Sequence, residues 1–113
     1  MTRAMTGVTV LAVYRPKPGK AAALDRLVSE HLPLLRAQGL VSDHPGTVLK
    51  AADGTVVEIF EWVSQAAIDQ AHANKAVTAL WERFGAACDY LPIADLPEAK
   101  QLFSPFTRVE VER

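Results

Sequence analysis

The chain has 113 residues, of which 50% are hydrophobic and 22% are charged, as is typical of one folded domain. Its formal net charge of -1 provides no basic surface for nucleic acid or for an anionic membrane, so we expect neither partner. A single cysteine, Cys88, excludes an internal disulfide framework, and residues 1–14 contain no apolar run long enough for a signal peptide or a membrane span. We therefore expect a single cytoplasmic domain over residues 1–113.

The first half of the chain predicts a strand followed by a helix. Residues 8–14 are few, rich in β-branched side chains and apolar on both faces, which favours a buried strand. Two prolines in the segment 15–19 end this strand, because proline cannot donate to a sheet ladder. Residues 20–38 carry an apolar stripe at spacings of three and four, so they predict a helix, with Gly39 suited to end it.

The second half predicts a hairpin, a second helix and a last strand. Asp53-Gly54 lies between two apolar runs, which predicts a hairpin of strands 47–51 and 55–63. Ser64 can cap a helix from residue 65, and Asn74 can restart it, with an apolar stripe that continues to Leu91. Residues 89–101 hold two prolines and predict a loop with one helical turn, and 106–111 predict the last strand.

The order β-α-β-β-α-β predicts an α+β, ferredoxin-like fold, with a four-stranded antiparallel sheet and both helices on one face. Alternate residues of the strand 55–63 point to opposite faces of the sheet. We expect the aliphatic face to pack against the helices, and the other face carries the aromatic residues Phe60 and Trp62. Burying each of these two rings stabilises by about 2–3 kcal/mol, so we expect a second copy to cover them in a homodimer. Trp62→Arg should then give a monomer or an aggregate. The alternative is that residues 89–101 cover the face of a monomer.

Three stretches carry a resemblance to a known family: residues 13–20, which run from a strand into Lys17-Pro18-Gly19, the Glu61-Trp62 pair, and residues 67–72. They resemble the dimeric α/β-barrel superfamily, and within it the antibiotic-biosynthesis-monooxygenase group, over residues 8–84. The resemblance implies a dimeric α/β barrel with a pocket between sheet and helices in each subunit. Some members oxidise aromatic polyketides with no metal or flavin, and others degrade haem, isomerise or dehydrate small molecules. Trp81 lies about where the haem-degrading members have an iron-ligating His, which argues against haem degradation.

Four titratable residues are candidates for acid–base chemistry. Glu58 shares the aromatic face, where a buried carboxylate suits a proton acceptor, although an intersubunit salt bridge or a water-facing edge would also explain it. His31 lies on the apolar stripe of the first helix, where it can equally be a packing residue. His44 follows an Asp in a sequence that also suits a turn, and His72 matches a His of the resembled group that is often structural. The candidates for lining a pocket, or for packing in the core, are aromatic: Tyr14, Phe60, Trp62 and Trp81.

Two functional hypotheses remain open. No set of His, Cys, Asp or Glu has metal-ligand spacing and no Gly-rich loop follows a strand, so we expect no metal site and no cofactor. The first hypothesis is a cofactor-independent monooxygenase-like or proton-transfer enzyme that acts on a small apolar or aromatic molecule. The alternative is a non-catalytic homodimeric protein that binds a ligand or a partner, with the aromatic face as dimer core.

Overall fold

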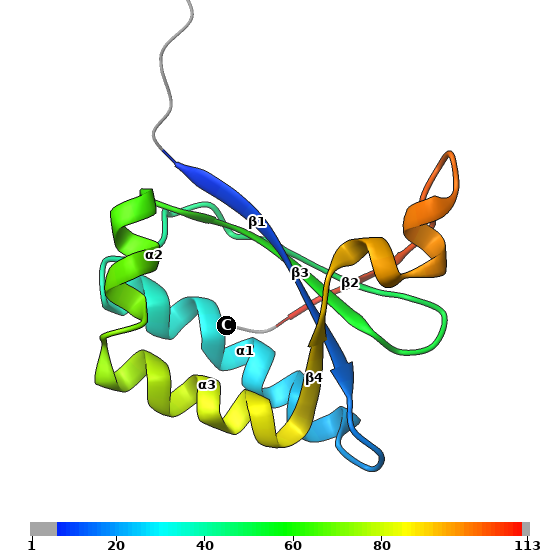
Figure 1. The fold of residues 1–113 in the computed structure, drawn as a ribbon, viewed down its shortest axis with the longest axis horizontal. Coiled ribbons are helices and arrows are strands. Elements are labelled where there is room, and N and C mark those ends of the chain that lie inside the picture. Colours follow the sequence, from blue (N-terminus) through cyan, green and yellow to red (C-terminus); the bar gives the residue numbers. More distant parts are fainter. Residues whose placement is uncertain (1–6, 112–113) are drawn as a thin grey trace, which may run out of the picture.

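The computed structural model describes residues 7–111, and in this range five strands form one open antiparallel sheet with three α-helices on one face (Figure 1). The elements are β1 (Val8–Pro16), α1 (Ala21–Ala37), β2 (Thr47–Lys50), β3 (Val56–Trp62), α2 (Gln65–Ala71), α3 (Lys75–Ala87), β4 (Cys88–Leu91) and β5 (Thr107–Val109), with the 3-10 helices η1 (Ile93–Asp95) and η2 (Pro97–Lys100) before β5. The strand order is β4-β1-β3-β2-β5. This α+β arrangement is compatible with a ferredoxin-like fold, and the sheet does not close into a barrel within the described chain.

Side-chain caps begin both helices that follow β3. The Ser64 hydroxyl accepts a hydrogen bond from the Ala67 N–H, and the Asn74 side-chain oxygen accepts from the N–H groups of Ala76 and Val77. Both caps satisfy backbone donors that have no partner inside the helix, which is why Ser and Asn are favoured there. The two predicted helix starts are confirmed, and the bend at Asn74 divides the predicted helix into α2 and α3.

The prediction of four strands is wrong, because residues 88–91 form an additional strand. They were expected at the end of a helical stripe and in a loop, but they make β4, in which Tyr90 pairs with Tyr14 of β1. The predicted last strand is β5, which lies at the opposite edge of the sheet and pairs with β2. The helix α3 leads directly into β4 at Cys88, with no turn residue between them. A spacing of three from Cys88 to Leu91 fits a helix as well as a short strand, so periodicity alone did not separate them.

The two faces of the sheet are also the reverse of the predicted assignment. Phe60 and Trp62 lie on the helix side, in a buried cluster with Leu35 of α1. The aliphatic Val57 and Ile59 lie on the opposite face. Alternation along a strand shows which side chains share a face, but the side on which a helix crosses depends on the hand of the crossover. The argument that Phe60 and Trp62 need a second copy to cover them is therefore wrong, because the helices of the same chain cover them.

The sheet face opposite the helices, hereafter the outer face, is only partly covered. Residues 93–100 fold over one end of it, where Leu96 is fully buried against Val13 and Val57. Coverage by this segment is the alternative that the sequence left open. At the other end Leu11 is 49% exposed.

No helix of the described residues is long and apolar enough to span a membrane.

Because the helices cover the sheet face that carries Trp62, the expected effect of Trp62→Arg changes. Trp62 is buried inside one chain, so an arginine there would place a charge in the core and leave a large void. We expect a loss of about 4 kcal/mol or more in the free energy of unfolding, which removes the cooperative thermal transition measured by circular dichroism. Leu11→Arg is the matched control, because Leu11 is half exposed on the outer face, and its transition should persist. A folded Trp62→Arg chain would contradict this description of the core.

Candidate functional site

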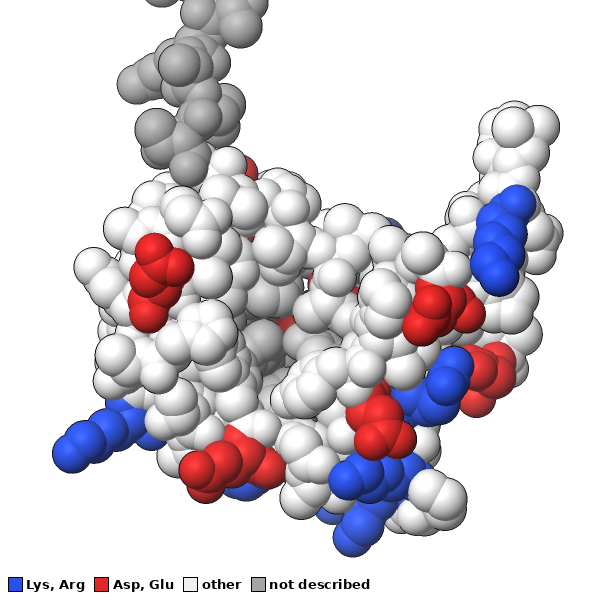
Figure 2. Space-filling model, viewed as in Figure 1, with Lys and Arg blue, Asp and Glu red and all other residues white. Residues whose placement is uncertain are grey.

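A cavity of about 330 Å3 lies between the sheet and the helices. In the space-filling view this side of the molecule is hollowed between the helices and β1, and charged side chains gather around the edge of the molecule while the hollow itself is largely uncharged (Figure 2). The four residues expected to line a pocket do line it, together with His31 and seven further residues of β1, α3 and β4. The full lining consists of Val10, Leu11, Ala12, Val13, Tyr14, His31, Phe60, Trp62, Trp81, Phe84, Tyr90 and Leu91.

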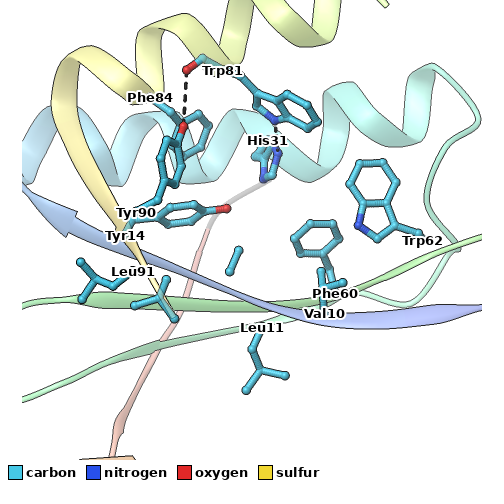
Figure 3. Close-up of a pocket in the computed structure, with 12 residues that line it drawn as sticks. Val10, Leu11, Tyr14, His31, Phe60, Trp62, Trp81, Phe84, Tyr90 and Leu91 are labelled. Carbon is cyan, nitrogen blue, oxygen red and sulfur yellow. Dashed lines mark hydrogen bonds between the residues drawn. The ribbon is translucent and has the colours of Figure 1, made fainter. Parts of the chain in front are cut away.

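The aromatic rings around the cavity pack against one another, mostly edge to face. The ring of His31 lies 5.0 Å from that of Phe84 and 5.4 Å from that of Phe60, measured between centroids. Trp62 and Trp81 meet at 6.4 Å, nearly perpendicular to each other. Such pairs add to the energy of burial and restrict the rotamers of the rings. Figure 3 shows these rings on one side of the strands and Leu11 pointing to the other side. The walls therefore suit a flat, apolar molecule.

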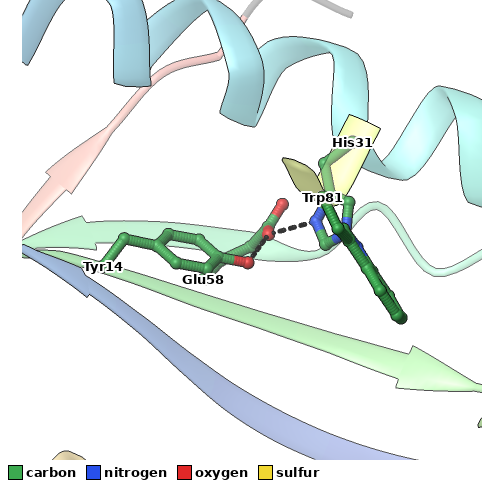
Figure 4. A network of polar contacts seen from close by, with 4 residues as sticks. All are labelled: Tyr14, His31, Glu58 and Trp81. Carbon is green, nitrogen blue, oxygen red and sulfur yellow. Dashed lines mark hydrogen bonds and ion pairs between the residues drawn. The ribbon is translucent and has the colours of Figure 1, made fainter. Parts of the chain in front are cut away.

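A chain of hydrogen bonds joins four residues from four different elements (Figure 4). Trp81 of α3 donates from its indole nitrogen to Nε2 of His31 in α1, at 2.9 Å. His31 Nδ1 lies 2.7 Å from Oε1 of Glu58 in β3, and the Tyr14 hydroxyl of β1 donates to the same oxygen at 2.8 Å. Glu58 is fully buried, and Tyr14 and His31 are each 3% exposed. The fold thus brings together two of the four acid–base candidates.

The direction of these hydrogen bonds fixes the form of His31. An indole N–H can only donate, so Nε2 of His31 must accept and carries no proton. The ring proton then lies on Nδ1, which donates to Glu58. The 2.7 Å distance would also fit an ion pair, but a doubly protonated ring would set two N–H groups against each other at 2.9 Å. We therefore describe His31 as neutral in the free protein, with Oε1 of Glu58 accepting from two neutral donors.

Burial keeps the tyrosine at this site protonated. The pKa of Tyr14 is raised well above its usual value of 10, first by burial and then by the nearby Glu58 carboxylate, to which its hydroxyl donates. Burial, together with Cys88, raises the pKa of Tyr90 to about 12. Burial and the neighbouring Asp89 raise the pKa of the Cys88 thiol to about 11. These groups are neutral near pH 7, so Tyr14 acts as a hydrogen-bond donor.

The other two candidate histidines lie outside this chain of hydrogen bonds. His44 is exposed in the loop before β2, where its Nδ1 accepts a hydrogen bond from the Gly46 N–H at 3.3 Å, as the turn alternative predicts. His72 is exposed after α2, and its Nδ1 donates to the carbonyl of Ile68 at 2.9 Å. Neither lines the cavity, although the ring of His72 lies 5.2 Å from that of Trp81. His72 therefore contacts the site only from outside.

Two aromatic residues of the cavity were not predicted from the sequence as lining residues. Phe84 was placed on an apolar stripe, which indicates burial but not a cavity wall. Tyr90 was missed because β4 was missed, and its pairing with Tyr14 is what brings it to the cavity. Among residues 7–111, no group of three or more His, Cys, Asp or Glu side chains could hold a metal ion.

The raised tyrosine pKa values predict a loss of stability above pH 10. Tyr14 keeps its proton in the folded chain and loses it near pH 10 when unfolded, so its stabilisation is full below pH 10 and declines as the pH rises further. At pH 11 this effect amounts to about 1 kcal/mol relative to pH 9, measured by urea unfolding.

Tyr90→Phe leaves Tyr14 as the single tyrosine, since the sequence has two. In this variant the absorbance of tyrosinate should appear near pH 10 only in urea. Its appearance near pH 10 in the folded protein would contradict the described burial.

Comparisons of this chain with protein-family models, with curated proteins and with solved structures found no match.

Proposed function

We propose that this protein is a cofactor-independent enzyme that removes a proton from a small, apolar, ring-containing molecule bound in the cavity. The observation that carries the proposal is the buried Glu58 carboxylate, which is linked through His31 to the wall of an aromatic cavity. His31 faces the ligand, and Glu58 orients its ring and stabilises the imidazolium that forms when it accepts a proton. Tyr14 holds the same carboxylate oxygen in place.

The reaction can end in two ways. If the proton returns to another position, the product is an isomer. If the deprotonated ring reacts with O2, a ring CH2 becomes a carbonyl with one oxygen atom, and the other leaves as water. The second outcome is the monooxygenase-like reaction of the antibiotic-biosynthesis-monooxygenase group, to which we assign this chain. The strand order β4-β1-β3-β2, to which β5 is added at the β2 edge, and the position of all three helices on one face support this assignment to the dimeric α/β-barrel superfamily.

The proposal includes a homodimer formed through the outer face. Leu11 and Val63, at the open end of this face, are 49% and 39% exposed. Leu102 and Phe103 are 92% and 86% exposed on the segment before β5, which projects from the rest of the molecule in Figure 1. Burying a Leu or Phe side chain stabilises by about 1.5–3 kcal/mol. A second copy that lies on the outer face, with this segment packed along its edge, covers all four side chains.

A non-catalytic binding protein is the second candidate, and one observation favours it. Nε2 of His31 already accepts a hydrogen bond from Trp81, so the four polar side chains satisfy one another without a ligand. A network of this kind also serves to fix a single core packing. In that case the cavity binds a ring without changing it.

The proton-transfer proposal predicts that Glu58→Gln strongly lowers turnover and retains binding. A thermal-shift screen of aromatic polyketides, quinones and small lactones first selects the ligand. With an anthrone, whose ring CH2 is acidic, exchange of that C–H in D2O and uptake of O2 should proceed with chelator present and no flavin. We expect Glu58→Gln to lower both rates by about 100- to 10,000-fold, the usual contribution of general acid–base catalysis, because His31 loses the carboxylate that orients it and stabilises its imidazolium.

Glu61→Gln is the matched control, because Glu61 lies on the same strand with its side chain on the opposite face and only partly buried. Its rates should stay within about two-fold of those of the unaltered protein, since it lies outside the Tyr14–Glu58–His31 network. If anthrone binds but its C–H does not exchange, the enzyme proposal is wrong and the binding protein is favoured.

The dimer proposal predicts a light-scattering mass of twice the 12.3 kDa of one chain. Leu11→Arg should reduce this mass to that of one chain, because the substitution places a charge in the proposed contact while the fold is kept. Arg26→Glu, on the exposed side of α1 away from the outer face, is the control and should remain dimeric. A single-chain mass for the unaltered protein at micromolar concentration would refute the dimer.

A further inference from the structure

We infer that Trp81 is a displaceable cover over the base, and that the ligand is a flat ring bearing an acidic hydroxyl, that is, a phenol or an enol. This inference rests on the proposed function and names the ligand class and the reacting atom of the same site. The ring takes the position of the indole, and its hydroxyl takes the hydrogen bond that Trp81 gives to Nε2 of His31.

A ligand that binds at Nε2 of His31 must donate a hydrogen bond to it. This nitrogen has one lone pair in the plane of the ring, and the Trp81 N–H occupies it at 2.9 Å. A ligand that reaches the base must therefore replace this donor with one of its own, because an acceptor there would leave Nε2 unpaired in a buried site. A ring without an O–H group can fill the cavity but cannot replace the indole at His31. An anthrone meets this requirement through its enol tautomer, whose O–H proton leaves the same anion as the ring C–H proton does.

The indole is held in a way that permits its displacement. Trp81 is only partly buried at the edge of two core clusters, against both of which it packs, and its side chain makes one hydrogen bond, the one to His31. Its ring lies between Trp62 on the inner side and the exposed His72 at 5.2 Å. The hydrogen bond from the Tyr90 hydroxyl reaches the backbone carbonyl of Trp81, at 3.5 Å, and leaves the indole free to turn. The displacement is a change of the Trp81 rotamer that gives up its ring contacts with Trp62 and His72 and leaves α3 in place.

The groups around His31 favour transfer of the proton from a neutral acid. Glu58 of β3 is the charged group in contact with His31 among the described residues, while Phe60 of β3 and Phe84 of α3 contact its ring edges. Tyr14 of β1 reaches the ring only through Glu58 and stays neutral. When the ligand O–H bond breaks, its electron pair stays on the oxygen and the proton forms an N–H bond at Nε2. The imidazolium is then paired with the Glu58 carboxylate at 2.7 Å, so the step leaves no unpaired cation.

The test uses 4-nitrophenol, whose ionised form absorbs visible light, at a pH below its own pKa. We expect binding to produce the absorbance of the ionised form, and 4-nitroanisole, which lacks the hydroxyl, to bind at least 10-fold more weakly. Trp81→Phe keeps a ring but removes the competing donor, so it should bind 4-nitrophenol about 2- to 10-fold more tightly, the value of one hydrogen bond. In the variant Trp62→Phe, Trp81 is the single tryptophan, and its fluorescence should change on binding.

A second readout does not depend on a variant folding. In the 15N spectrum of the free protein, Nε2 of His31 should be unprotonated and Nδ1 protonated, and 4-nitrophenol should convert the ring to the doubly protonated form. Bound nitrophenol without the ionised absorbance, or equally tight binding by Trp81→Phe and the unaltered protein, would overturn the inference. If these fail while anthrone C–H exchange still depends on Glu58, the inference is wrong and the proposed function stands. If anthrone exchange fails as well, both are wrong.

Discussion

A buried carboxylate that must be satisfied inside the core constrains the rest of this structure. Glu58 is fully buried, and an ionised carboxylate without partners in such a place would cost several kcal/mol. Oε1 accepts from Tyr14 and from His31, so β1, β3 and α1 must meet at one point. Trp81 extends the same set of contacts to α3. These hydrogen bonds thus fix how α1 and α3 lie on the sheet, and the aromatic rings beside them form the walls of the cavity.

The sequence predicted the elements better than their arrangement. The caps at Ser64 and Asn74 and the hairpin at Asp53-Gly54 are local signals, and each forms where it was expected. Which face of β3 the helices cover is not a local property, because it depends on the hand of the crossover, and the aromatic side chains lie on the side opposite to the one expected. The strand β4 was missed because four residues that follow a helix directly give no turn signal.

Part of the candidate site was predictable from the sequence, namely its residues but not their contacts. Glu58 is a charged residue on an otherwise apolar face of the strand, and this is true whichever face of the sheet the helices cover. Its link to His31 joins residues 27 positions apart, and neither periodicity nor motif spacing encodes such a contact. His44 and His72 carry the same side chain, but a turn and a helix end keep them at the surface. Residue type alone made all three histidines candidates. Only the packing of α1 on the sheet shows that His31 lies in the buried network and that the other two do not.

The direct junction between α3 and β4 has a consequence for how this chain can vary in length. Ala87 ends the helix and Cys88 begins the strand, while the Lys17 N–H donates to the Ala87 carbonyl at 2.9 Å and anchors the junction to the end of β1. Because alternate residues of a strand point to opposite faces, one residue inserted or deleted here would turn Tyr90 to the outer face and put Asp89 or Leu91 in the position that the Tyr90 side chain now occupies. A change of length at this junction would therefore alter the wall of the cavity itself.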